Sequence, residues 1–265
     1  MGLLKKKKIV LALGGGSARG LAHIGVLKVF EKHFGRDKMP FDMIIGTSIG
    51  SLIGAAYCLG MPLDELEEKA LGFNWPTMVD PGLYATGLVK GDKLERVISN
   101  IIGLKGFRDM KLPFALTTTD IETGEELVHT SGDLVKLIRA SCSWPGVFNA
   151  VELDGRLLVD GGVRNSIPTK AAYAMGATFV VAINPGFAVR HQRIKHVMEA
   201  IVQFIQIMGE ELNNYQAKVA DIAIKPDLPD VDQFAFDKAR IIIDAGEVAG
   251  EKEFGRLKRK LFFHH

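Results

Sequence analysis

Short apolar runs alternate with segments of helical periodicity along most of this chain. The runs expected to form strands are 6–13, 43–45, 114–119, 126–130, 178–183 and 220–224. The segments with helical spacing are 21–34, 48–59, 64–71, 92–102, 133–140, 167–175, 191–213 and 234–261. A strand that is apolar throughout is typical of a parallel sheet buried on both faces. The pattern therefore predicts an α/β fold of three layers, a mostly parallel sheet with helices on both faces.

Turn and loop residues add three local predictions. Asp154 followed by Gly155 is a favoured two-residue turn, so 151–159 is predicted to form a β-hairpin. Asp92 with Glu95 three residues later predicts a capping box at the start of the helix that ends at Ile102. Residues 72–88 are rich in Gly, Pro and aromatic residues, and we expect a loop or cap region there.

The chain has 265 residues, which is long enough to bury a complete core and is ordinary for one α/β domain. It contains no internal repeat, low-complexity tract or obvious linker. We therefore expect a single domain over 1–265. Its motifs lie within a core of about 7–185, and a C-terminal strand and helices follow over 186–262.

The charge is nearly balanced, with 33 basic and 31 acidic residues and a net charge of +2. This balance argues against a nucleic-acid partner, which would call for a strongly basic patch. Basic residues do gather at 5–8 and 256–260. Such runs usually form solvated faces, but each basic residue near an anionic membrane contributes roughly 1 kcal/mol of attraction. Peripheral contact with a membrane therefore stays open, as does the oligomeric state.

The two cysteines and the N-terminus favour a cytoplasmic protein. Cys58 and Cys142 lie among apolar or small residues, so we expect reduced core thiols. The apolar run at 9–13 is too short for a signal peptide and meets three glycines, which favours a buried strand. No stretch approaches the ~18 apolar residues of a membrane-spanning helix. No cluster of residues has metal-ligand spacing, and neither a metal nor a cofactor is expected.

A G-x-S-x-G motif lies between a predicted strand and a predicted helix, with Gly46 and Gly50 on either side of Ser48. A tight turn from strand to helix holds such a serine in a strained conformation with its hydroxyl exposed, and the glycines remove side chains that would collide there. The alternative is a serine that only caps a helix between two packing glycines. The strand before it and the apolar helix after it favour a nucleophile.

The proton acceptor for this serine is less obvious. His129, His191 and His196 are the candidates for a histidine base, but none lies in a loop directly after a strand. Asp160 ends an apolar strand and is followed by Gly161 and Gly162, where backbone can approach closely. Its carboxylate would need burial or specific contacts to serve as a base, because an exposed aspartate has a pKa of about 3.9. Residue types alone fit a turn-forming Asp-Gly equally well.

A glycine-rich loop, Gly14–Gly20, joins the first predicted strand to a helix. Its unobstructed amides suit a phosphate or an oxyanion. The loop matches neither G-x-G-x-x-G nor the P-loop pattern, so an oxyanion hole that serves the serine is the better interpretation. Arg19 can bond backbone carbonyls and hold the loop, or face solvent; we favour the first.

The order of these motifs resembles the patatin-like phospholipase family, its bacterial members in particular. The resemblance rests on G-G-G-S-A-R-G-L-A-H-I-G-V-L at 14–27, G-T-S-I-G at 46–50, R-A-S-C-S-W-P-G-V-F at 139–148, and D-G-G at 160–162. It covers about residues 7–185; the remainder fits only in general α/β character.

The resemblance implies a Ser-Asp dyad without a histidine. Ser48 would be the nucleophile and Asp160 its base, with the amides of Gly15 and Gly16 at the oxyanion. The predicted oxyanion loop is Gly14, Gly15, Gly16 and Ser17, and the supporting motif residues are Arg19, Gly20, Gly46, Gly50, Gly161 and Gly162. Many family members have glycine where this chain has Ser17, which bears on the geometry of the loop.

These expectations describe a serine hydrolase of lipid or phospholipid acyl esters that works through an acyl-enzyme. An acyltransferase or thioesterase, and a regulatory or lipid-binding protein without activity, are the alternatives. Phe73, Trp75 and Tyr84 in 72–88 and the helix over 197–208 are candidates for the rim of an acyl-binding site, although aromatic and methionine residues at such spacings are more often core.

Overall fold

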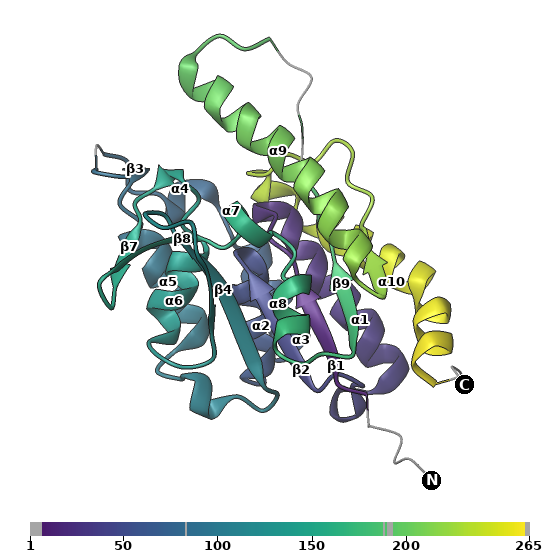
Figure 1. Ribbon diagram of the computed structural model, residues 1–265. Helices are drawn as coiled ribbons and strands as arrows, with labels where there is room; N and C mark the ends of the chain where they lie inside the picture. Colours follow the sequence, from purple (N-terminus) through teal and green to yellow (C-terminus); the bar gives the residue numbers. More distant parts are fainter. Residues whose placement is uncertain (1–6, 83, 188, 190–192, 263–265) are drawn as a thin grey trace.

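A sheet of eight strands forms the middle of the molecule (Figure 1). The computed structural model describes residues 7–82, 84–187, 189 and 193–262. Residues 5 and 6 of the N-terminal basic run and the candidate His191 lie outside this part of the chain. The strands of the sheet are β1 (Ile9–Leu13), β2 (Met43–Thr47), β4 (Phe114–Asp120), β5 (Glu126–His129), β7 (Val151–Leu153), β8 (Arg156–Asp160), β9 (Phe179–Ile183) and β10 (Ile222–Ile224).

Most neighbouring strands are parallel, as the apolar runs predicted. The order is β10-β9-β1-β2-β4-β8-β7, with β5 paired to β4 outside this path. The five strands from β10 to β4 pair in parallel. β5, β7 and β8 pair antiparallel at one side. The predicted hairpin joins β7 to β8, and both turn residues, Asp154 and Gly155, have positive φ angles of 52° and 72°.

Helices cover both faces of this sheet. They are α1 (Ala22–Phe34), α2 (Ile49–Cys58), α3 (Leu63–Leu71), α4 (Trp75–Met78), α5 (Asp92–Ile102), α6 (Leu134–Ser141), α7 (Gly162–Asn165), α8 (Thr169–Ala174), α9 (Val197–Val219) and α10 (Ala239–Phe262). Among the described residues, no helix has both the length and the apolar character needed to cross a membrane.

Alternate residues of the central strands face two separate apolar cores. Leu11, Leu13 and Ile44 belong to the larger core, to which α1, α2, α3, α5, α6 and α10 contribute. Val10 and Ala12 belong to the smaller core, which α8 and the end of α9 cover. The three-layer prediction is therefore confirmed. Strands from both parts of the chain join the one sheet, while the single domain over 1–265 stays a prediction.

The long helix predicted at 191–213 is placed differently. α9 begins at Val197, after His196, and continues to Val219. The consecutive asparagines at 213 and 214 indicated an end because asparagine is a poor helix former. In the structure Asn213 is buried and its side chain bonds that of Asn184, so a tertiary contact compensates for the low propensity.

Two smaller predictions were incomplete or wrong. The segment 72–88 is not only loop, because it holds α4 and the start of β3 (Gly87–Val89), which pairs with β6 (Gly146–Phe148) in a second, two-stranded sheet. The capping box at Asp92 is absent, because Gly91 is the N-cap of α5. Asp80, from the preceding loop, caps that helix instead, as its carboxylate accepts from the amides of Gly91 and Lys93 over 2.6 and 3.2 Å.

Glycines set the crossing of α1 and α10. A Cβ on Gly25 would overlap the carbonyl oxygen of Ile243, and a Cβ on Gly246 would overlap that of Ala22. The two backbones therefore approach more closely than any side chain would allow. α10 consequently packs against α1 along the face of the larger core.

Gly246→Ala is expected to lower the free energy of unfolding by about 2 kcal/mol or more, because the added methyl group forces the two helices apart. Gly255→Ala on the same helix is the control. Its Cβ would find no neighbour nearer than 3.9 Å, so it should be neutral or stabilising by up to about 1 kcal/mol. Urea denaturation of both variants measures the difference, and equal stabilities would contradict this packing.

Candidate active site

β2 and β8 approach each other end to end along one edge of β4. Thr47, the last residue of β2, lies opposite Thr117, and Asp160, the last residue of β8, lies opposite Thr118. β5 pairs with β4 along 116–119, so it occupies the other edge. The residue that follows β2 and the residue that ends β8 are therefore brought together, although 112 positions separate Ser48 and Asp160 in the chain.

Ser48 forms the sharp turn between β2 and α2. Its φ and ψ angles are 55° and −129°, a conformation that non-glycine residues rarely adopt. A Cβ on Gly46 would overlap the backbone of Gly50, and a Cβ on Gly50 would overlap the carbonyl oxygen of Leu13. Both glycines are thus needed for the turn to pack against β1, which confirms the predicted strand-turn-helix geometry.

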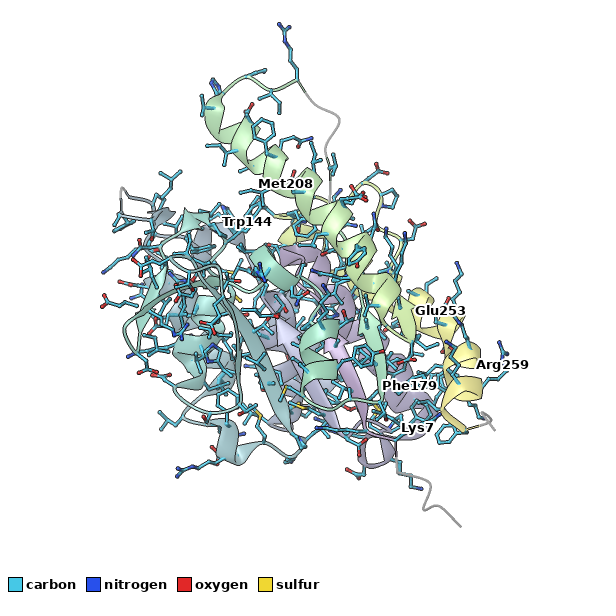
Figure 2. The ribbon with its side chains drawn as sticks, in the orientation of Figure 1. Lys7, Trp144, Phe179, Met208, Glu253 and Arg259 are labelled. Atoms are coloured by element: carbon cyan, nitrogen blue, oxygen red, sulfur yellow. The ribbon has the colours of Figure 1, made fainter. Side chains whose placement is uncertain are left out.

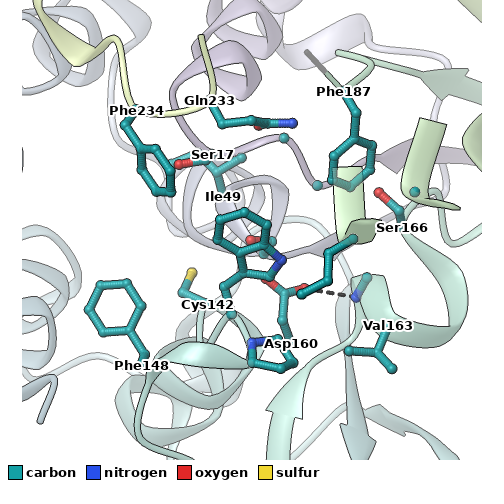
Figure 3. Close-up of a pocket in the computed structure, with 18 of the residues that line it drawn as sticks. Ser17, Ile49, Cys142, Phe148, Asp160, Val163, Ser166, Phe187, Gln233 and Phe234 are labelled. Atoms are coloured by element: carbon teal, nitrogen blue, oxygen red, sulfur yellow. Dashed lines mark hydrogen bonds between the residues drawn. The ribbon is translucent and has the colours of Figure 1, made fainter. Parts of the chain in front are cut away.

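The Asp160 carboxylate is buried, with 6% of the residue exposed. It hydrogen-bonds the side chain of Ser48, and the Gly162 amide donates to its Oδ1 over 2.7 Å (Figure 3). Burial raises the pKa of Asp160 to about 6, and the bonds from Ser48 and Gly162 oppose the shift. At neutral pH this group is a carboxylate with an unusually high proton affinity, which the sequence alone left undecided.

The glycine loop uses part of its amides for its own structure. The Gly14 amide donates to the Ile183 carbonyl over 3.0 Å, and the Gly15 amide donates to the Ser166 carbonyl over 2.8 Å. The amides of Gly16 and Ser17 make no such bond to the part of the chain that is described. The predicted oxyanion hole is thereby narrowed to Gly16 and Ser17, because the other two amides are already engaged.

Ser17 has a φ angle of 49°, in the left-handed region that favours glycine. This explains why a glycine is the easier residue at this position. The Ser17 amide is kept, and the residue lines the same cavity as Ser48.

Arg19 holds the glycine loop in place, as we favoured from the sequence. The side chain is 5% exposed. Its guanidinium donates to four carbonyls, those of Pro185, Gly186, Leu228 and Val231, over 2.6–3.2 Å. It therefore joins the loop to two segments from the second half of the chain.

Two other motif glycines permit close packing. A Cβ on Gly20 would overlap the Ile49 side chain, and a Cβ on Gly161 would overlap the Thr117 hydroxyl. Next to Gly20, the buried His23 bonds the Gly14 carbonyl over 2.7 Å. Burial lowers the pKa of His23 to about 4, so this imidazole is neutral and supports the loop from beneath.

Ser48 and Asp160 open into an apolar cavity of about 390 Å³. Six aromatic residues contribute to its lining, namely Phe73, Trp75, Trp144, Phe148, Phe234 and Phe236. Of the predicted rim residues, Phe73 and Trp75 line the cavity, as does Met208 on α9, whereas Tyr84 is not among its lining residues.

No histidine is among the residues that line this cavity within the described chain. His129 bonds Thr118 Oγ1 over 2.7 Å, and burial lowers the pKa of its imidazole. His196 is exposed at the start of α9. Neither is placed to accept a proton from Ser48. The described residues likewise contain no group of three His, Cys, Asp or Glu side chains that could hold a metal ion.

Several polar residues around the site were not singled out from the sequence. Ser141 Oγ accepts from the Ser48 amide over 2.8 Å. Ser166 Oγ and Gln233 Nε2 are buried without a hydrogen-bond partner and line the cavity (Figure 3). Ser166 follows the D-G-G motif closely, which is a weak signal, whereas nothing in the sequence around Gln233 points to the site.

Cys142 also borders the nucleophile, and its thiol hydrogen-bonds the side chains of Ser51 and Ser48. Burial and then the nearby Asp160 raise the pKa of the Cys142 thiol to about 12. The thiol is therefore protonated at neutral pH and does not compete with Ser48 as a nucleophile.

Comparison with known proteins places these motifs in one family. The family model described as patatin-like phospholipase matches residues 11–173. The human protein named patatin-like phospholipase domain-containing protein 6 is 36% identical over 192 residues, which is 69% of this chain and 14% of that protein. An NTE family protein of Mycobacterium tuberculosis is 32% identical over 180 residues, which is 67% of this chain and 49% of that protein.

The same relation extends to a fungal enzyme and to a solved structure. Lysophospholipase NTE1 of Scheffersomyces stipitis is 30% identical over 192 residues, which cover 70% of this chain and 12% of that protein. This chain thus spans half or less of the length of these three relatives. VipD from Legionella pneumophila has the same fold, with a TM-score of 0.63 at 12% identity over 94% of this chain and 67% of that one. Because the family model matches more than half of its residues, the chain belongs to the patatin-like phospholipase family.

Proposed function

We propose that this protein is a serine hydrolase that cleaves lipid acyl esters through a Ser48–Asp160 dyad. The observation that carries the proposal is the strained Ser48, hydrogen-bonded to a buried carboxylate whose pKa is raised to about 6, at an apolar cavity. Membership of the family and the names of its relatives support hydrolysis of lipids in general. The dyad, the acyl-enzyme and the oxyanion hole are the finer part of the proposal.

The first half of the reaction forms the acyl-enzyme. Asp160 accepts the Ser48 proton as Ser48 Oγ bonds to the ester carbonyl carbon, and the carbonyl oxygen becomes an oxyanion. The free amides of Gly16 and Ser17 donate to that oxygen. The intermediate collapses when the bond to the leaving alkoxide breaks, and Asp160 returns its proton to that alkoxide.

The second half repeats these steps with water. Asp160 accepts a proton from a water molecule whose oxygen bonds to the acyl carbon. Collapse of the second intermediate breaks the bond to Ser48 Oγ, which recovers the proton from Asp160 as the fatty acid leaves. A neutral Cys142 beside Ser48 takes no part in either half.

The cavity supports a lipid substrate. Its lining is mostly apolar and aromatic, which suits an acyl chain, while Ser166 and Gln233 offer buried polar groups. Such groups are costly to bury unpaired. A bound ester would satisfy them with its own oxygens, so we place the polar part of the substrate beside the glycine loop and the chain among the aromatics.

Labelling by a fluorophosphonate tests the nucleophile directly, because this reagent forms a bond only with an activated serine. The wild-type protein should be labelled once, at Ser48, and Ser48→Ala should not be labelled. Ser166→Ala, which removes another cavity serine, should still be labelled. Unlabelled wild-type protein, or equal labelling of Ser48→Ala, would rule out the proposed dyad.

A further inference from the structure

Helix α9 turns apolar side chains away from the protein (Figure 1). The outer face of α9 comprises Val197, Ile201, Phe204, Met208, Tyr215 and Val219. Their spacings of three, four or seven residues place them in one stripe along the helix. Val197, Phe204, Met208 and Tyr215 are 76%, 60%, 63% and 59% exposed. In a helix that only covers a core, this face would be polar.

The inner face of α9 is polar instead. Gln206, Asn213 and Gln216 are at most 2% exposed. Gln216 accepts from the Ile167 amide over 2.9 Å and donates to the Arg164 carbonyl over 3.1 Å. Rotating α9 to hide its apolar stripe would break these bonds and leave buried amides unpaired, at a cost in free energy. The outward orientation of the stripe is therefore built into the fold.

The outer face is continuous with the mouth of the catalytic cavity. Met208 belongs to the stripe and also lines the cavity, together with Ile205, Gly209 and Leu212 of the same helix. Figure 2 shows Met208 and Trp144, another lining residue, at the same end of the molecule. An apolar surface that reaches the cavity at this point leads directly to Ser48.

Basic residues accompany the start of this stripe. Arg193 and Lys195 are exposed immediately before α9, beside the exposed Ile194 and Val197. In Figure 1 this end of α9 projects beyond the rest of the protein. An apolar helix face with cations at its projecting end is complementary to a bilayer surface with anionic headgroups.

We propose that the outer face of α9 docks on an anionic lipid bilayer and holds the cavity mouth against it. The stripe would enter the boundary between headgroups and acyl chains, with Arg193 and Lys195 at the phosphates. Substrate lipid would then move from the membrane into the cavity along Met208. This inference rests on the proposed function for its substrate, but the docking step itself needs no catalysis.

Binding to vesicles is measured in the Ser48→Ala protein, so that no lipid is consumed. The test pair is Val197→Ser with Phe204→Ser, neither of which lines the cavity. The matched pair is Val248→Ser with Phe262→Ser on α10, which are 70% and 59% exposed. Binding to phosphatidylcholine vesicles that contain phosphatidylglycerol should fall roughly tenfold or more for the α9 pair, since two large apolar groups no longer enter the bilayer. It should remain unchanged for the α10 pair.

Two further arms separate docking from its rivals. Pure phosphatidylcholine vesicles should bind less protein than anionic ones, and added salt should reduce that difference. With Ser48 restored, the α9 pair should hydrolyse a soluble p-nitrophenyl ester at the wild-type rate and a vesicle-embedded ester more slowly.

Equal vesicle binding by the α9 and α10 pairs would overturn the proposal. So would sedimentation data in which the α9 pair dissociates a dimer without any change in vesicle binding, because a second copy of the chain would then cover the stripe. A Ser48 that is never labelled would defeat the proposed function and leave the binding result intact.

Discussion

Asp160→Asn is expected to lower kcat/KM for acyl-ester hydrolysis by roughly 10³-fold, within the range that removal of a general base costs. Asparagine keeps the size of the side chain and can still accept the Gly162 amide that bonds Oδ1. It cannot take the Ser48 proton. The loss should appear in kcat more than in KM, because the cavity that holds the acyl chain is unchanged.

The pH profile identifies the same group. Because burial raises the pKa of Asp160 to about 6, kcat/KM of the wild-type protein should fall tenfold per pH unit as the pH drops below about 6, where Asp160 becomes protonated. The residual activity of Asp160→Asn should lack this limb. Rates with a soluble ester between pH 4.5 and pH 8 test both statements.

Stability should change in the opposite direction to activity. The pKa of Asp160 is raised from 3.8 to about 6 in the fold, so the protonated carboxyl is favoured there. Wild-type stability from this group is complete below pH 3.8 and is lost as the pH rises through 6. Asp160→Asn escapes that loss and should gain up to about 3 kcal/mol over the wild type by pH 8 relative to acid pH.

Asp154→Asn is the matched control. Asp154 lies in the β7–β8 turn at a positive φ that asparagine tolerates, so both rate and stability should stay near the wild-type values. An Asp160→Asn protein that keeps a tenth or more of the wild-type rate would refute Asp160 as the base. The same holds if its low-pH limb persists, since another residue would then be accepting the proton.

The two members of the dyad differ in how far the sequence predicted them. Ser48 is predictable because its turn depends on neighbours two positions away, Gly46 and Gly50, which exclude side chains from the packing against β1. Asp160 is ambiguous locally, because an aspartate before two glycines also suits a turn. Its position depends on β2 and β8 sharing one edge of β4, which is a long-range pairing that no local pattern encodes.

Long-range contacts also explain what was missed. The Gly15 amide is engaged by the Ser166 carbonyl, a partner 151 positions away in the chain, so three consecutive glycines could not reveal which amides are free. The periodicity of α9 predicted a helix but not its orientation. Asn213 and Gln216 face the body because Asn184, Arg164 and Ile167 offer them partners.

Arg19→Ala is expected to lower the free energy of unfolding by about 3–5 kcal/mol, because it leaves a set of buried carbonyls without their donor. The side chain bonds the carbonyls of Pro185, Gly186, Leu228 and Val231. Two distant segments are then no longer tied to the glycine loop, so labelling of Ser48 by the fluorophosphonate should also slow in the protein that remains folded.

The guanidinium geometry, rather than charge alone, should account for this effect. Arg19→Lys keeps the charge but lacks the planar fork that reaches several carbonyls at once, so it should recover less than half of the loss. Arg256→Ala is the control at an exposed arginine, with a side chain 52% exposed, and should change stability by no more than about 0.5 kcal/mol. Urea denaturation of the three variants decides the matter. Full recovery by lysine would mean that charge holds the loop, and a loss below about 1 kcal/mol for alanine would mean that water replaces the guanidinium at these carbonyls.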